Sequence, residues 1–272
     1  MKNNQHYPLC VLIPFRFGEQ EIPNKNLQKI HNVYLFQRSL THGIYLKNIL
    51  NLRICLSTDD SKEILKVKFL KRIFNKEIVG NIVKSDILLS DKGIDVHNRS
   101  ETLSRKNSPI DLTLENVRKN YIKKGITFDY WLLLQPTTPF RSMEDLTYIT
   151  KEILRGKSVK KESLISVSQV LDSHPARMYY KKNLRLNSLL NNQNDVYKRR
   201  QELKQIYIRD GGFYLFSDKL AAKGKLFSNN PHYFVRKFPW TINIDTVQNL
   251  NTAKLITKKT VNCDPNNNKI KL

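Results

Sequence analysis

Long apolar runs are missing from this sequence. No stretch approaches the roughly 18 apolar residues that a membrane-spanning helix needs, and residues 1–10 lack the apolar core of a secretory signal. We therefore expect a cytoplasmic protein without a membrane partner. Of the 272 residues, 40% are hydrophobic and 26% are charged, as in folded soluble domains, so disorder of the whole chain is not expected.

Cysteine is also scarce. The chain has three, Cys10, Cys55 and Cys263, and an odd number cannot pair completely. Cys10 and Cys55 lie inside apolar runs, where a small buried thiol packs well. The sequence thus favours buried, reduced thiols.

Acidic residues are few: 24 Asp and Glu stand against 47 Lys and Arg, which gives a net charge of +23. A basic surface attracts nucleic acid, anionic lipid or small anionic substrates. The lysines are scattered, however, in pairs such as residues 123–124, 160–161 and 258–259. Because no basic helix, zinc pattern or aromatic RNA motif accompanies them, a nucleic-acid module is the least favoured interpretation.

Short apolar runs alternate with amphipathic segments over the first 165 residues. Strands are expected at residues 9–14, 52–57, 129–134 and 163–167. Helical spacing of apolar residues is found at residues 34–50, 61–74, 112–124 and 143–154. This order predicts an α/β fold with a doubly wound, mostly parallel sheet. Ligands of such sheets bind over the carboxyl ends of the strands, which here carry residues 15–26, 58–60 and 135–141.

The rhythm changes after residue 170. Residues 171–207 are polar, basic and aromatic, which is typical of an insertion or a subunit-contact arm. The α/β pattern resumes at residues 212–216 and 241–245, followed by a helix at 247–256. Without internal repeats, we expect one domain over residues 1–257 and a disordered tail at 258–272.

The loop after the first strand has the composition of a phosphate-binding loop. Arg16, Gly18, Lys25 and Asn26 offer cationic side chains and backbone N–H groups to an anion. The loop lacks the glycine–lysine–serine/threonine ending of a Walker motif. By itself it is weak evidence.

Three further segments carry polar groups at strand or helix boundaries. Residues 134–141 read Leu-Gln-Pro-Thr-Thr-Pro-Phe-Arg, a rigid turn after a strand. Residues 199–203 read Arg-Arg-Gln-Glu-Leu and are followed by Asp-Gly-Gly-Phe-Tyr at 210–214. Asp245, before the last helix, is either a metal ligand or a helix N-cap.

In this order and spacing the chain resembles the acylneuraminate cytidylyltransferases, from about residue 8 to about residue 256. The matching segments are residues 15–26, Ser-Thr-Asp at 57–59, Arg99 with Leu103, residues 134–141, 200–203 and 242–246. The resemblance implies a Rossmann-like nucleotidyltransferase fold with a dimerisation arm. It also implies transfer of CMP from CTP to the anomeric hydroxyl of a sialic-acid-like nonulosonic acid, with release of pyrophosphate, in glycan synthesis.

The resemblance also implies roles for individual residues. Nucleotide-binding positions are Arg16, Gly18, Lys25, Asn26 and Arg99, and catalytic positions are Arg16, Lys25 and Asp245. Substrate-binding positions are Gln135, Arg177, Arg200 and Gln201, with Arg200 on the sugar carboxylate. Asp245 and Asn243 stand where the family holds Mg²⁺ (or Mn²⁺). The arm implies a homodimer whose second subunit completes the sugar site.

Three departures from the family pattern fall on this chemistry. Glu19 and Glu21 stand in the phosphate loop, where carboxylates repel a triphosphate. Asn243 replaces the first aspartate of the metal motif and brings no negative charge. Residues 104–108 add positive charge, and Ser100 replaces a proline. The alternative to an active enzyme is therefore a member that has lost transfer and serves as a binding or regulatory subunit.

Overall fold

The central sheet has eight strands among the described residues. The structure is a computed structural model that describes residues 4–17, 21–74, 81–105, 107–154, 162–190 and 197–259. The strand order is β12 (His232–Arg236), β8 (Ser163–Gln169), β11 (Tyr207–Ser217), β7 (Ile126–Leu133), β1 (Gln5–Pro14), β4 (Leu52–Thr58), β6 (Ile94–Asn98) and β5 (Asp86–Leu88). Only β11 and β5 run against the other strands of this sheet. The predicted mostly parallel sheet is confirmed.

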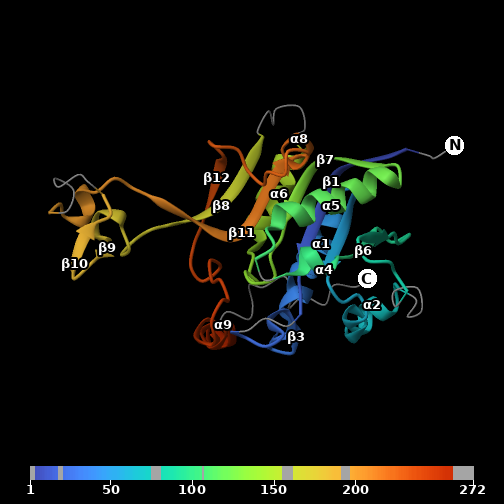
Figure 1. Ribbon diagram of the computed structural model, residues 1–272, viewed down its shortest axis with the longest axis horizontal. Helices are drawn as coiled ribbons and strands as arrows, with labels where there is room; N and C mark the ends of the chain where they lie inside the picture. The colour runs from blue at the N-terminus through green and yellow to red at the C-terminus, as the bar shows by residue number, and fades with distance from the viewer. Residues whose placement is uncertain are drawn as a thin grey trace.

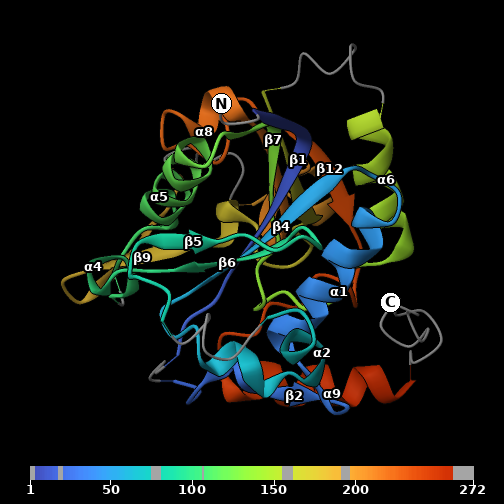
Figure 2. The same ribbon diagram turned by 90° about the vertical axis from the view of Figure 1, so that its right-hand side faces the viewer.

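Helices cover both faces of this sheet. α1 (Leu35–Lys47) and α6 (Met143–Leu154) pack on one face, and α5 (Ile110–Lys123) and α8 (Asp218–Ala221) pack on the other (Figure 2). Side chains of β1 point alternately to the two faces: Val11 lies in the core under α1 and α6, and Leu12 lies in the core under α5 and α8. A strand buried on both faces has to be apolar throughout, and this is why its sequence reads as one continuous apolar run.

A third, smaller core closes the carboxyl edge of the sheet. It joins α9 (Val247–Lys259) to the small ribbon of β2 (Lys29–Ile30) and β3 (Val33–Tyr34) through Ile30, Ile244 and Leu250. α9 continues two residues into the segment expected to be a disordered tail, and residues 260–272 lie outside the described residues.

The thiols agree with their prediction where they are described. Cys10 and Cys55 are free and fully buried in the core beneath α5. Cys263 lies outside the described residues. Within the described ranges, no helix is long and apolar enough to cross a membrane.

Several elements differ from the expectation. Residues 61–74 do not form one helix but a 3₁₀ turn, η2 (Glu63–Lys66), and a short helix, α2 (Lys68–Lys71). Residues 241–245 are not a strand, because this segment bonds to the turn after β7 instead of joining the sheet. The edge strands β5 and β12 and the inner strand β6 were not predicted.

The segment expected to be an arm extends away from the sheet (Figure 1). Its described part carries an antiparallel hairpin of β9 (Tyr179–Lys182) and β10 (Arg185–Ser188). Apolar side chains on the hairpin face solvent, with Leu184 99% and Leu186 68% exposed. Exposed apolar side chains clustered on a protruding element are typical of a protein contact.

One buried histidine makes the fold sensitive to acid. His97 on β6 lies between Ser57 Oγ at 2.9 Å and Asn116 Oδ1 at 2.7 Å. Burial lowers the pKa of His97 to about 4, although the hydrogen bond to Asn116 opposes this. The neutral ring is therefore the form that the native structure accommodates.

We predict that unfolding free energy falls as the pH drops from about 6.5 towards 4. Over this window His97 takes up a proton in the unfolded chain but stays neutral in the native chain. The unfolding free energy therefore falls with a limiting slope of about 1.4 kcal/mol per pH unit. Denaturant unfolding of His97→Gln should show a shallower pH dependence. An identical slope in parent and variant would contradict the assignment; the exposed His6→Gln serves as the control.

Candidate functional site

A cavity of about 180 Å³ opens at the carboxyl ends of β1 and β7. Its lining is supplied by the first loop, by the end of β6, by the start of α5 and by the turn after β7. Four predicted site residues meet here: Arg16, Asn26, Arg99 and Gln135. The edge of the sheet chosen from the strand pattern is therefore where the structure gathers them.

The first loop is held by an internal hydrogen bond and by hydrogen bonds to two neighbouring segments. Asn26 Nδ2 donates to the carbonyl of Arg16 at 2.8 Å, and the backbone N–H of Phe17 donates to Asp59 Oδ1 at 3.1 Å. Arg16 Nη1 donates to the carbonyl of Arg105 at 2.7 Å. Gly18 and Glu19 lie outside the described residues, whereas Glu21 is exposed.

Arg99 is the most deeply buried cation of the cavity, with 5% of its surface exposed. Its Nη2 donates to the carbonyl of Phe15, while its buried Nε has no hydrogen-bond partner in the described part of the chain. Burial lowers the pKa of Arg99 to about 10, against the attraction of Asp59. A buried N–H without a partner costs free energy that an anionic ligand can recover.

Lys25 and Asp245 meet beside this cavity. Lys25 Nζ lies 3.5 Å from Asp245 Oδ1, and the Lys25 side chain is only 12% exposed. The backbone of Ile244 donates to the carbonyl of Thr137 at 2.7 Å, which fastens this segment to the turn after β7. Lys25 and Asp245, which meet in this contact, are 220 positions apart in the chain.

Asp245 is not the cap of the last helix. The cap is Thr246, whose Oγ1 accepts from the backbone N–H of Asn249 at 3.2 Å. The Asp245 carboxylate instead accepts from Asn243 Nδ2 at 2.6 Å and faces Lys25. The interpretation of Asp245 as an N-cap is therefore wrong.

Few potential metal ligands lie at the position expected to bind Mg²⁺. In the described ranges no three His, Cys, Asp or Glu side chains gather into a metal site. Asp245 offers one carboxylate and Asn243 one amide oxygen, 3.5 Å from Thr138 Oγ1. Because protein-bound Mg²⁺ commonly keeps waters and takes one or two carboxylates with substrate phosphates, these groups fit a metal that enters with a nucleotide.

The turn after β7 presents Gln135 to the cavity from a buried support. Arg141, fully buried, donates through Nη2 to the carbonyl of Gln135 at 3.2 Å and through Nε to the carbonyl of Gly212 at 2.6 Å. Burial and the neighbouring Arg236 lower the pKa of Arg141 to about 9. The turn is thus tied to β11 through one guanidinium.

The remaining predicted residues lie elsewhere in the chain. Arg177, Arg200 and Gln201 line a separate cavity of about 400 Å³ at the base of the arm, which shares no lining residue with the first. Arg200 Nη1 already contacts Asp172 Oδ1 at 3.1 Å, but both side chains are about half or more exposed. Ion pairs this exposed are weak and open to exchange with another carboxylate.

His174 lines the cavity of the arm and has a structural role. Its Nδ1 accepts from the backbone N–H of Ala176 at 3.1 Å, and its Nε2 lies 3.0 Å from the carbonyl of Lys204. Both ring nitrogens are therefore used in holding the base of the arm, and no general base is identified there.

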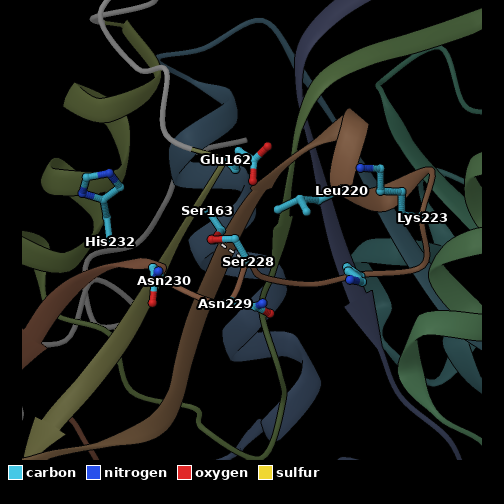
Figure 3. Close-up of a pocket in the computed structure, with 9 residues that line it drawn as sticks. Glu162, Ser163, Leu220, Lys223, Ser228, Asn229, Asn230 and His232 are labelled. Atoms are coloured by element: carbon cyan, nitrogen blue, oxygen red, sulfur yellow. Dashed lines mark hydrogen bonds between the residues drawn. The ribbon is translucent and has the colours of Figure 1, made fainter.

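A larger cavity, of about 470 Å³, lies at the opposite edge of the sheet (Figure 3). It sits at the amino ends of β8 and β12, next to Ser163 and His232. None of the predicted site residues lines it. Size alone does not locate the chemistry of an α/β sheet, whose ligands bind at the carboxyl ends.

Sequence reasoning missed the charged network beneath the turn. Arg236 Nε lies 3.0 Å from Asp145 Oδ2, and its Nη1 lies 3.3 Å from Asp210 Oδ2. These three side chains are all nearly inaccessible to solvent. Asp210 was visible in the Asp-Gly-Gly segment, whereas nothing in the local pattern around Arg236 or Asp145 marks them as buried.

Comparisons with known proteins agree with this fold. No protein-family model and no curated protein matches the sequence. A solved CMP:2-keto-3-deoxy-manno-octonic acid synthetase complexed with CTP is similar at a TM-score of 0.57 and 12% identity, over 93% of this chain and 99% of that chain. A 4-diphosphocytidyl-2C-methyl-D-erythritol synthase from Anaerococcus prevotii is similar at a TM-score of 0.53 and 12% identity, over 93% and 96%. At this identity, the likeness establishes the shared fold.

Substitution of two buried arginines should change the unfolding free energy by different amounts. Burial works to lower the pKa of Arg53, but its hydrogen bonds to Asp95, at 2.6 and 2.7 Å, raise it above the ordinary value. Arg53→Met leaves Asp95 buried and unpaired, and we predict a loss of about 3 kcal/mol in unfolding free energy. Arg99→Met removes a cation that burial disfavours, and we predict a change within about 1 kcal/mol. Denaturant unfolding measures both, and a larger loss at Arg99 than at Arg53 would contradict this account.

Proposed function

We propose that this protein transfers CMP from CTP to the anomeric hydroxyl of a sialic-acid-like nonulosonic acid and releases pyrophosphate. The observation that carries the proposal is the cavity at the carboxyl edge, where Arg16, Asn26, Arg99 and Gln135 converge beside Lys25. The shared fold supports CTP as the nucleotide, since one of the similar structures contains CTP. The resemblance of the motifs to acylneuraminate cytidylyltransferases supports the acidic sugar.

In the proposed reaction the sugar's anomeric oxygen attacks the α-phosphorus of CTP. One bond forms between that oxygen and phosphorus, the bond from the α-phosphorus to the bridging oxygen breaks, and pyrophosphate leaves with that oxygen. The hydroxyl proton passes to solvent or to a base that the geometry does not identify. Arg16, Lys25 and Arg99 serve to neutralise the phosphates and to hold the α-phosphorus in line.

A divalent metal belongs to the proposal as a partner of the nucleotide. Mg²⁺ or Mn²⁺, when bound, neutralises phosphate charge and favours departure of pyrophosphate. Asp245 is the residue proposed to hold it, with Asn243 beside it. In the chain itself, Asn243 orients the Asp245 carboxylate through the 2.6 Å hydrogen bond.

The sugar acid is proposed to bind between two subunits. Gln135 faces the nucleotide cavity, whereas Arg177, Arg200 and Gln201 line the cavity of the arm. A homodimer in which the arm of one subunit reaches the cavity of the other would bring the two groups together. The exposed leucines of the β9–β10 hairpin support such a contact.

A binding or regulatory subunit without transfer activity is the second candidate. The observation that favours it is Asn243, because its amide brings no charge where the family has a carboxylate. One experiment distinguishes the active enzyme from the binding subunit. Pyrophosphate release from CTP is measured with Mg²⁺ or Mn²⁺ in the presence of sialic, legionaminic or pseudaminic acid or 3-deoxy-manno-octulosonate. Release that depends on one acid supports the enzyme, and CTP binding without release supports the subunit.

Arg200→Ala should separate sugar from nucleotide. We predict that kcat/KM for the sugar acid falls about a hundredfold, as when a charged hydrogen-bond partner is lost, while the dissociation constant of CTP stays within about twofold. Arg199→Ala is the matched control, because Arg199 is adjacent but does not line the arm cavity. Equal loss of sugar use and CTP binding would remove Arg200 from the sugar site.

Asn243→Asp should strengthen the metal site. We predict that the Mg²⁺ concentration for half-maximal rate falls by about fivefold or more, since the variant adds a second carboxylate next to Asp245. Initial rates over a Mg²⁺ series at fixed CTP measure this. No shift in the half-maximal concentration would place residue 243 outside the metal's reach.

A further inference from the structure

β11 carries an irregularity directly behind the turn that holds Gln135. Its pairing with β8 shifts register between Arg209 and Tyr214, so the ladder is interrupted at the Asp-Gly-Gly segment, and we call this irregular stretch the bulge. Bulges next to active sites commonly redirect a side chain or the backbone. This segment stood out in the sequence, but the proposed reaction gives it no role.

Buried hydrogen bonds fix the conformation of the bulge. Asp210 Oδ1 accepts from Ser166 Oγ at 2.5 Å and from the backbone N–H of Gly212 at 2.9 Å. The guanidinium of Arg236 packs where a side chain at residue 212 would lie, and Arg141 donates to the Gly212 carbonyl. The bulge therefore cannot move without disturbing the charged network underneath the site.

Gly211 is the point at which the bulge meets the turn. Its φ is +73°, in the left-handed region that favours glycine. A Cβ at this position would lie 2.9 Å from Thr138 Oγ1 and 3.1 Å from Gln135 Oε1. Both polar groups thus occupy space that only a residue without a side chain leaves open.

Gln135 and Thr138, the two side chains that lie against Gly211, contact different parts of the site. The Gln135 side-chain amide lines the nucleotide cavity and makes no hydrogen bond within the described part of the chain, so it is available to a ligand. Thr138 Oγ1 lies 3.5 Å from Asn243 Oδ1, and Asn243 donates to Asp245. A displacement of the turn would change the position of the Gln135 side chain itself, and the proposed function assigns that side chain to the sugar.

We infer that Gly211 is a positioning residue for substrate use: by lacking a side chain it lets Gln135 and Thr138 sit against the bulge, with the Gln135 amide aimed at the acidic sugar. This inference rests on the proposed function for the identity of the ligand. The contact between Gly211 and Gln135 is a property of the fold and can be tested without any ligand.

The test compares Gly211→Ala with Gly224→Ala. Gly224 has a φ of +65°, but nothing lies within 4 Å of the place that a Cβ would take there, so its variant suffers similar backbone strain without touching a neighbour. In ¹H–¹⁵N spectra the side-chain amide signal of Gln135, assigned by its loss in Gln135→Ala, should move in Gly211→Ala and stay in Gly224→Ala. An unmoved signal in folded Gly211→Ala would overturn the inference.

Kinetics supply the second readout. Gly211→Ala should lower kcat/KM for the sugar acid about tenfold to a hundredfold, as small misplacements of a reacting group do, with CTP binding within about twofold of the parent. In a Gln135→Ala background the same substitution should cost clearly less sugar use than in the parent, since Gln135 is gone and only the close approach to Thr138 Oγ1 remains. Full additivity of the two substitutions would overturn the inference.

A third variant distinguishes backbone strain at positive φ from the space that a Cβ takes at residue 211. Gly211→Asn adopts positive φ more readily than alanine yet carries the same Cβ, and it keeps the test open if Gly211→Ala does not fold. It should show the same amide shift and the same loss of sugar use, whereas parental behaviour would overturn the inference. If the parent neither binds CTP nor releases pyrophosphate, the proposed function fails, and the Gln135 signal still decides the role of Gly211.

Discussion

The rest of the site depends on the hydrogen bonds of Arg141, whose guanidinium is buried beneath the turn after β7. Arg141 is inaccessible to solvent, yet it ties the carbonyl of Gln135 to that of Gly212 and so joins two neighbouring strands at their functional edge. A buried charge is tolerated only when its surroundings satisfy it. Here Arg236 lies nearby and is neutralised by Asp145 and Asp210, and Gly212 of β11 leaves the room that the Arg236 guanidinium requires.

Above this support, the cavity is arranged for an anion. Its innermost cation, Arg99, is held in a place where burial disfavours its charge, and its buried Nε–H has no partner among the described residues. Stability given up in this way is common at binding sites, because the ligand supplies the missing interaction. Lys25 is held ready by Asp245 at the side of the same cavity. Three of the chain's many cations, Arg16, Lys25 and Arg99, thus gather at this edge, where the proposed function places the phosphates.

The sequence predicted the parallel sheet because its inner strands are buried on both faces and read as continuous apolar runs. It also pointed to the edge where Arg16, Asn26, Arg99 and Gln135 come together, since residues 15–26 and 135–141 follow two such strands. It missed β12 and the buried role of Arg236, because this five-residue edge strand is only partly buried and offers a short apolar run next to a charged residue. The 241–245 segment was read as a strand although its backbone bonds to Thr137. Gly211 could not be interpreted from the chain alone, because its neighbours Gln135 and Thr138 are more than 70 residues away.

Calorimetric titration of the purified protein with CTP, and in parallel with UTP, tests the central claim that the cavity at the carboxyl edge is a cytidine nucleotide site. The account predicts one CTP bound per chain, weaker binding of UTP, and loss of CTP binding in Arg99→Met while that variant remains folded. A parent protein that gives no binding heat with CTP, or an Arg99→Met variant that binds CTP as tightly as the parent, would contradict it.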